Sequence, residues 1–505
     1  MNFNINTAEV AVNETVFSKS IEQSVDCDIT LPDYCGDIGR ILKCFVRPNI
    51  TNSSLNSQRI VIDGTVIVSL MYVSDGKIQC YEYSSPFSAN IDFNCEYAGA
   101  ILNVSTSPQY VNCRAVNSRR FEVHGAFVIN ACLNACHKES VVDDADGAGV
   151  ELLKDTIMAC SAIGTQTEDC AINQVVDIGK EKPQIKSILR NTATAVLTET
   201  KQISNKVLVK GELRISTLYL SDNDTIEHEQ NTLPISQIVN LQGLTQESIT
   251  DIKLNLISLE ISAKASATGE MTLLDINAIT AVNVCAYVCM EVPIVTDAYS
   301  TAYKSECSKK NVNIDRLVTT TDKSFTHSFS LEIGASVTRV IDMWCDNVTS
   351  KAVLKDGKLL YTGKLSVYAL TESESGDVQL KQSDTEFEFD SECTSNIKNI
   401  KCSPRVNVLS SDYTMGETAL EIRAVMSVRA VVFETESMSL IENIELDESS
   451  PKQKKNMMFI YYPDENENLW SIARQYNTTV KSISEQNELE DDTVPGGQPI
   501  LIWCK

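Results

Sequence analysis

The sequence has little of what most enzymes depend on. It contains only four histidines and three tryptophans among 505 residues. The histidines lie in no recognised catalytic string, and the sequence shows no serine-centred elbow, phosphate-binding loop or dinucleotide fingerprint. The histidines are His124, His137, His228 and His327. We therefore predict no catalytic residues, no cofactor and no metal, and we expect a protein that is not an enzyme.

Positive charge and long apolar runs are also scarce. Lysine and arginine total 43 against 68 acidic residues, which gives a formal net charge of −25. Because nucleic acids and anionic membranes attract basic proteins, neither is expected as a charge-driven partner. No apolar run approaches the roughly 18 residues of a membrane span. The first 17 residues lack the basic start and apolar core of a signal peptide, so we expect no export by the general route.

Cysteine is abundant, but its pattern argues against a disulfide framework. The 17 cysteines are odd in number and lie within apolar runs of a long chain, which predicts reduced thiols in a cytosol. Two pairs are spaced four residues apart, Cys132 with Cys136 and Cys285 with Cys289. On a strand such residues are about 13 Å apart, too far to share one metal ion. We expect these cysteines to pack in a core.

An internal repeat organises most of the chain. Single cores stop growing near ~250 to 300 residues, so this length predicts roughly three to four domains. RIVIDGTVIVSLMYV, KVLVKGELRISTLYL and KLLYTGKLSVYALTE align without gaps around Gly64, Gly211 and Gly363. At the same offsets an upstream apolar segment recurs, and a further apolar segment follows each glycine. Each repeat is therefore a domain with its own core.

The repeats have the pattern of antiparallel sheets. Val66, Val68 and Leu70 alternate with more polar residues, which predicts one buried and one solvated face. A glycine inside a strand indicates a bulge or a close approach of two backbones. We predict a mainly β protein with three β-rich, sandwich-like repeat domains followed by a small βααβ domain.

Changes in composition predict the domain limits. Linkers are typically polar or charged, or rich in small residues, and lack apolar periodicity. We also expect a helix over Val150 to Ala159. The predicted limits are an amino-terminal segment (1–19), repeat 1 (20–140), a linker (141–160), repeat 2 (161–306), a linker (307–320), repeat 3 (321–446), a linker (447–457) and the terminal domain (458–505).

The last 48 residues read as a complete small domain. An apolar strand at 458–462 precedes Asn468, which is placed to cap a helix whose apolar face includes Leu469 and Ile472. Thr478 or Thr479 caps a second helix, and an apolar run at 499–503 forms the closing strand. This order, the string Leu-Trp-Ser-Ile-Ala at 469–473 and the closing Gly-Gln-Pro-Ile-Leu-Ile at 497–502 resemble a LysM domain.

Three β-rich repeats before a carboxy-terminal LysM domain resemble the clostridial SipL-type spore morphogenetic proteins, whose repeats are called SPOCS domains. The resemblance implies a scaffold of spore coat assembly that is made in the mother-cell cytoplasm and recruited to the forespore surface. There it would bind the ATPase that forms the basement layer of the coat. The alternative is a protein that binds peptidoglycan, through its N-acetylglucosamine units, in the spore cortex or cell wall.

The predicted binding residues lie in the terminal domain. Glycan-binding LysM domains usually read Gly-Asp-Thr in the loop beside their groove, whereas this chain has Asn-Glu-Asn at 466–468, and residues 458–505 hold eight acidic against three basic residues. Both features favour a protein ligand. Trp470 and Trp503 can each be an interface anchor or a core residue. The predicted contact residues are Ile460, Tyr462, Asn466, Asn468, Leu469, Trp470 and Gly497.

Overall fold

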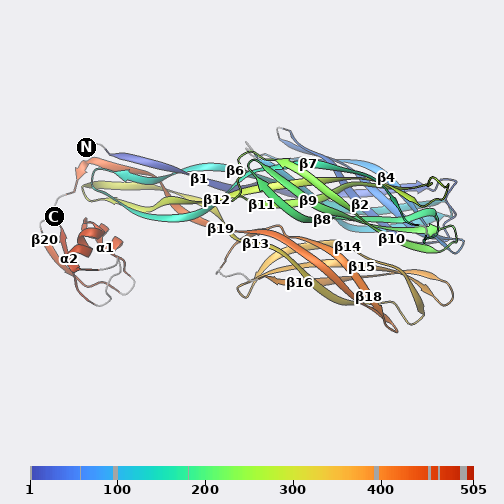
Figure 1. The fold of residues 1–505 in the computed structure, drawn as a ribbon. Coiled ribbons are helices and arrows are strands. Elements are labelled where there is room, and N and C mark those ends of the chain that lie inside the picture. The colour runs from blue at the N-terminus through green and yellow to red at the C-terminus, as the bar shows by residue number, and fades with distance from the viewer. Residues whose placement is uncertain are drawn as a thin grey trace.

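Three β units and one small domain with two helices follow one another along the chain (Figure 1). The computed structural model describes residues 3–56, 58–94, 100–179, 181–391, 397–452, 457–464, 467–489 and 498–504. The predicted fold class, three sandwich-like β repeats followed by a βααβ domain, is confirmed.

Each unit is built from the same series of strands. Unit 1 contains β1 (Asn4–Thr30), β2 (Arg40–Asn56), β3 (Arg59–Ser74), β4 (Lys77–Asp92), β5 (Ile101–Asn117) and β6 (Arg120–Asp146). Unit 2 contains β7 (Val150–Asp177), β8 (Ile185–Ile203), β9 (Lys206–Ser221), β10 (Ile226–Asn240), β11 (Ile249–Lys264) and β12 (Leu273–Ser300). Unit 3 contains β13 (Tyr303–Glu332), β14 (Val337–Lys355), β15 (Lys358–Ser373), β16 (Val378–Ser391), β17 (Ile400–Cys402), β18 (Arg405–Met415) and β19 (Ala419–Pro451).

The strand order is the same in all three units. The first, last and fifth strands form one antiparallel sheet, and the second, third and fourth strands form the other. In unit 3, β17 and β18 together take the place of the fifth strand, since both pair with β19. The two sheets bury their alternating apolar side chains against each other, as Tyr72 of β3 and Phe127 of β6 do in unit 1.

The three repeat glycines lie in the central strands, where neighbouring backbones approach closely. A Cβ atom on Gly211 would lie only 2.7 Å from the carbonyl oxygen of Val196, and one on Gly363 would lie 2.5 Å from Cζ of Phe387. The register of β14 against β15 shifts between Asp346 and Thr349, next to Gly363. The predicted bulge and close approach are therefore both present.

The first and last strands of each unit are long enough to build a second structure, which we call the stalk. They contain 27 to 33 residues, whereas the central strands contain 16. At ~3.3 Å per residue the long strands reach about 90 Å or more. Beyond the sandwiches the ribbons β1–β6, β7–β12 and β13–β19 run together to the end that carries both termini (Figure 1). Their facing side chains form an apolar core that includes Val10, Val141, Ile294, Ile314 and Leu440.

Several segments that were predicted to be linkers are strands of the stalk. Residues 150–160, expected as linker and as a helix over Val150–Ala159, lie in strand β7, and residues 307–320 lie in β13. Residues 4–19, expected outside repeat 1, belong to β1.

The chain reverses at the stalk tip, where Gly147, Ala148 and Gly149 all have positive φ. The small, acidic composition thus marks a tight turn, and the strands on either side continue to it. Of the third predicted linker, residues 447–451 continue β19, and residues 453–456 lie outside the described residues.

One disulfide corrects the expectation that all thiols are reduced. Cys160 of β7 and Cys289 of β12 are directly opposed across the ribbon, with Cα atoms 4.0 Å apart, and their sulfurs are bonded. They are separated by 129 positions in sequence, so spacing gave no sign of this pairing. The other cysteines that the structure describes are free.

The three units also pack against one another through their second sheets. Their outer faces share a cluster in which Met71 of unit 1, Leu218 of unit 2 and Leu370 of unit 3 are buried. Beside it the guanidinium of Arg190 pairs with the carboxylate of Asp342, both buried, and lies 4.1 Å from the ring centre of Trp344. The sandwiches are thus gathered at one end of the stalk, and the terminal domain lies at the other (Figure 1).

Candidate functional site

The terminal domain folds as its sequence pattern predicts. It consists of β20 (Met457–Tyr461), α1 (Leu469–Tyr476), α2 (Val480–Asn487) and β21 (Ile500–Cys504), with β20 and β21 antiparallel. Asn468 caps α1, since its side-chain oxygen accepts a hydrogen bond from the backbone N–H of Ser471 at 2.8 Å. Of the two threonines considered for α2, Thr479 is the cap.

The core of this domain contains one of the predicted contact residues. Leu469 is 1% exposed and packs with Ile472, Ile483 and Ile502 between the helices and the sheet. Leu469 therefore cannot touch a ligand directly, and its assignment as a binding residue is wrong. The helical spacing that marks an apolar face places this leucine on the side that faces the sheet.

Asn487 fastens the second helix to the closing strand. Its amide nitrogen donates to the carbonyl oxygen of Leu501 at 2.7 Å, and its amide oxygen accepts from the N–H of the same residue at 2.6 Å. The nitrogen also donates to the carbonyl oxygen of Ile483 at 2.9 Å. One side chain thus forms hydrogen bonds with three backbone groups.

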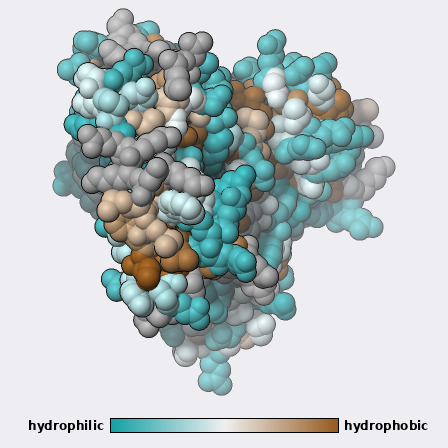
Figure 2. Space-filling model, turned by 90° about the vertical axis from the view of Figure 1, so that its left-hand side faces the viewer, coloured by the Kyte–Doolittle hydropathy of each residue, from teal (hydrophilic) through white to brown (hydrophobic). Residues whose placement is uncertain are grey.

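The outer face of the two-stranded sheet is apolar and exposed. We call it the sheet face, and it consists of Met458, Ile460, Leu501 and Trp503, together with Tyr462, which follows the last residue of β20. Ile460 is 64% and Tyr462 68% exposed, so these two predicted contact residues are accessible. Figure 2 looks onto this end of the molecule and shows apolar residues gathered among hydrophilic ones. Asn466 and Gly497, the predicted contact residues in the two loops, lie outside the described residues.

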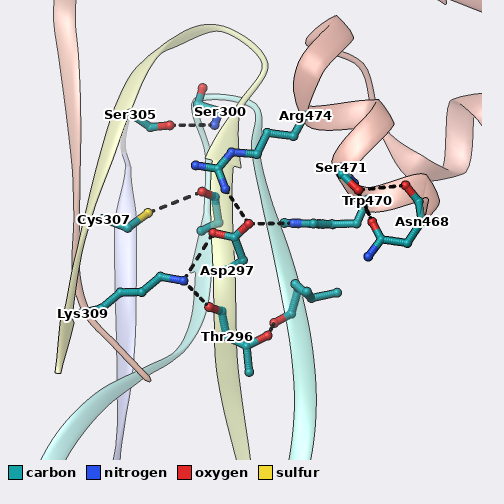
Figure 3. Close-up of polar contacts among 12 residues, drawn as sticks. Thr296, Asp297, Ser300, Ser305, Cys307, Lys309, Asn468, Trp470, Ser471 and Arg474 are labelled. Atoms are coloured by element: carbon teal, nitrogen blue, oxygen red, sulfur yellow. Dashed lines mark hydrogen bonds and ion pairs between the residues drawn. The ribbon is translucent and has the colours of Figure 1, made fainter. Parts of the chain in front are cut away.

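Trp470 turns away from solvent and contacts the stalk. Its indole Nε1–H donates to Oδ2 of Asp297, on strand β12, at 2.8 Å (Figure 3). The guanidinium of Arg474, one turn further along α1, donates to the same oxygen at 2.6 Å. The indole also meets the ring of Tyr299 edge-on, with ring centres 4.9 Å apart. One carboxylate therefore collects two donors from one face of α1.

Tyr299 completes the contact. It is 2% exposed and packs with the apolar core of the terminal domain, and its hydroxyl donates to the carbonyl oxygen of Thr478 at 2.7 Å. Burial raises the pKa of this phenol well above its ordinary value. Lys452, at the end of the stalk, donates both to the carbonyl oxygen of Ser300 and to the side chain of Asn477. These contacts join the terminal domain to the stalk tip.

From the sequence, Trp470 could be an interface anchor or a core residue. In the structure it packs at a contact within the chain, between its own domain and strand β12. The indole is half-buried between the core of its own domain and strand β12. Asp297 and Trp470 are 173 positions apart, and no periodicity relates them. Only the return of β12 to the stalk tip brings them together.

In the first loop of the domain, the carboxylate of Glu467 accepts hydrogen bonds from nearby residues of the same domain. Glu467 stands where the Gly-Asp-Thr pattern has aspartate, and its two oxygens accept from the hydroxyl of Tyr461 at 2.7 and 2.8 Å. This contact raises the pKa of Tyr461 to about 12. Glu467 also accepts from the backbone N–H of Asp464. The acid that replaces the usual residue thus orders the loop locally.

The described residues offer little for metal or catalytic chemistry. Among them no group of three or more histidine, cysteine or acidic side chains is placed to hold a metal ion. The acidic turn at 32–37 encloses Arg119, whose guanidinium donates to Asp37 and to backbone carbonyls of that turn. A side-chain cation therefore occupies the centre of this turn. In the described part of the chain no helix is long and apolar enough to cross a membrane.

Comparison with known proteins places this architecture in a class. The model of the SPOCS domain of SipL matches residues 37–116 and 184–264, and the model of the LysM domain matches residues 465–503. The SPOCS matches cover β2 to β5 of unit 1 and β8 to β11 of unit 2, and unit 3 repeats their strand order. The searches of curated proteins and of solved structures found no match.

The molecule is therefore a protein of repeated β sandwiches that ends in one small binding module. More narrowly, its two SPOCS-domain matches and its carboxy-terminal LysM match make it similar to SipL, which agrees with the resemblance drawn from the sequence.

Proposed function

We propose that this chain is a non-enzymatic adaptor of the spore envelope whose LysM domain docks onto the ATPase of the coat basement layer. Its SPOCS and LysM domains support a sporulation-associated adaptor with a module of the peptidoglycan-binding kind. In this proposal the protein is made in the mother-cell cytoplasm and is recruited to the forespore surface.

The observation that carries the proposal is the sheet face. Single exposed apolar residues are common on protein surfaces, but here four of them share one side of a two-stranded sheet, and a fifth, Tyr462, follows directly after β20. Two are aromatic, and the centres of protein interfaces are enriched in aromatic side chains. A partner that covers this surface and excludes water from it would gain binding free energy from the burial of these apolar side chains.

The separation of parts supports an adaptor role. The three sandwiches lie at one end of the stalk, and the LysM domain lies at the other (Figure 1). A chain of this form can hold two assemblies at once, because linked modules raise each other's effective concentration. The second candidate function, binding of peptidoglycan, rests on the LysM match itself.

A capture experiment with full-length protein tests the proposal. The full chain should retain the purified coat ATPase, and Ile460→Glu should reduce capture at least tenfold, because burial of an isoleucine contributes about 1.5 to 3 kcal/mol. Ile238→Glu is the matched control, since Ile238 is 53% exposed on β10, in a sandwich. It should leave capture unchanged.

The same proteins should be sedimented with purified peptidoglycan. Retention on peptidoglycan without capture of the ATPase would overturn the adaptor proposal and favour the second candidate. Equal capture by Ile460→Glu and wild type would show that the sheet face is not the docking surface.

A further inference from the structure

Helix α1 presents a second surface of the LysM domain, which we call the α1 face and define by Trp470 and Arg474. From its contacts we infer that this face recognises an extended strand carrying an acidic residue and an aromatic residue two positions apart. Strand β12 of the same chain supplies that pair through Asp297 and Tyr299 and acts as an internal ligand. The consequence for docking rests on the proposed function above, whereas the recognition itself does not.

The spacing of the pair follows from strand geometry. Residues i and i+2 of a strand point to the same side, so Asp297 and Tyr299 both face α1. The carboxylate accepts from the indole and from the guanidinium, and the latter bond is charge-assisted. Two positions on, the phenol packs edge-on against the indole and reaches the carbonyl oxygen of Thr478. Each of the two side chains of the internal ligand therefore meets a complementary group on the domain, and Figure 3 shows the contacts of Asp297.

The LysM domain brings a complete core of its own to this contact. Leu469, Ile472, Ile483, Ile500 and Ile502 are all at most 1% exposed, and the LysM match includes every one of them. Among the residues that the structure describes, Tyr299 is the one buried member of this cluster that comes from outside the domain. Tyr299 therefore packs against a core that the domain forms from its own residues, as the side chain of a ligand would.

Covalent linkage explains how a small contact can hold the domain. Only residues 452–456 separate the end of β19 from the start of β20. A tether this short gives the α1 face a local concentration of its internal ligand on the order of millimolar. An external strand with the same acidic and aromatic pair must compete with that concentration. A partner can therefore occupy the α1 face only if it binds tightly enough to displace the internal ligand at this local concentration. We call this requirement the threshold set by the stalk.

A peptide experiment on the full chain tests the recognition without any coat protein. Fluorotryptophan labelling gives separate ¹⁹F signals for the three tryptophans, and Trp470→Phe assigns the signal of interest. The double variant Asp297→Ala/Tyr299→Ala removes the internal ligand. A peptide with the sequence of residues 293–303 (PIVTDAYSTAY) should then shift the Trp470 signal of this variant at a concentration at least tenfold lower than it does for wild type.

Two controls make the result specific. The same peptide with asparagine in place of its aspartate should bind the double variant at least tenfold more weakly. Glu306→Ala, which removes an exposed acid of the neighbouring strand β13, should behave as wild type. Equal response of wild type and double variant, no response of either, or no dependence on the peptide's acid would overturn the inference.

The ATPase then tests the consequence for docking. If the partner uses the α1 face, the double variant should capture the ATPase at least threefold better than wild type. Equal capture by the two proteins would overturn the threshold role of the stalk. If neither protein captures the ATPase, the proposed function fails, and the peptide result still decides the recognition.

Discussion

Three glycines set how closely the second and third strands of each unit approach. At these positions any side chain would enter the space of a carbonyl oxygen on the neighbouring strand. None of the three needs a positive φ, so the requirement is steric. A residue without a Cβ atom is therefore a condition for the bulge beside it and for the packing of the two sheets.

Gly363→Ala should destabilise unit 3 by roughly 1 to 3 kcal/mol, because the added methyl group overlaps the carbonyl oxygen of Thr349 and the ring of Phe387. Chemical denaturation of the full chain measures the effect. Gly164→Ala is a matched control, since its methyl group would meet only Cδ1 of Leu241, at an ordinary 3.4 Å. Equal stability of the two variants would contradict the steric explanation.

Buried tyrosines make the fold sensitive to alkali. Tyr219 is fully buried in β9, its hydroxyl donates to the carbonyl oxygen of Pro183, and burial raises its pKa from about 10 to about 12. The native state therefore keeps this proton between pH 10 and 12, where the unfolded chain loses it. The resulting stabilisation is complete below about pH 10 and is lost as the pH rises through 12.

We expect the midpoint of urea unfolding to fall steadily between pH 10 and 12. Tyr219→Phe should show a shallower fall over the same range, because the variant has one phenol fewer to ionise. A pH dependence identical to that of wild type would assign the effect to other groups.

Among the elements, the LysM domain shows how short helices and strands are held without a large core. Each helix contains eight residues and each strand five. Helices this short are marginal on their own, so caps and side-chain links to the sheet carry much of the order. Asn468 and Thr479 supply the caps, and Asn487 supplies the link to β21.

Asn487→Ala should lower the stability of the LysM domain by about 1 to 3 kcal/mol, because it leaves the N–H and carbonyl of Leu501 without this partner. Hydrogen exchange of the peptides that cover α2 and β21 should therefore accelerate. Glu485→Ala, on the exposed side of the same helix, should change exchange little. Similar exchange in the two variants would show that the link is dispensable.

At the scale of the whole molecule, apolar clusters join the three units both along the stalk and between their second sheets. Along the stalk the three ribbons share apolar cores, and at the other end the second sheets meet around Met71, Leu218 and Leu370. The Arg190–Asp342 pair lies at this second junction, between units 2 and 3. A buried charge is tolerated only with its partner, so this pair fixes how the two units meet.

Arg190→Met should destabilise the full chain by about 3 to 5 kcal/mol, because it leaves the carboxylate of Asp342 buried and unpaired. The double change Arg190→Met/Asp342→Leu should recover most of that loss. Arg40→Met serves as the control, since Arg40 pairs with Asp377 between units 1 and 3 at an exposed site, and such pairs contribute at most about 1 kcal/mol. Denaturation midpoints compare all three, and no recovery in the double variant would contradict the role of the pair.

Periodicity was sufficient to predict the strand class, the threefold repeat and the LysM domain. Alternation of apolar residues defines a strand face locally, and the caps at Asn468 and Thr479 depend on residues three positions away. The strands of the stalk were missed because their ends are polar and run into acidic turns. Composition alone does not distinguish such a strand end from a linker.

The sequence by itself determined what is local: the alternation of the strands, the glycines at close approaches and the order of the LysM domain. The tertiary structure alone decided which distant residues meet. The Cys160–Cys289 disulfide, the Arg190–Asp342 pair and the contact of Asp297 with Trp470 join positions 129 to 173 residues apart. The physical reason is that each partner is specified by the path of a long strand through space, and no repeating pattern along the chain encodes that path.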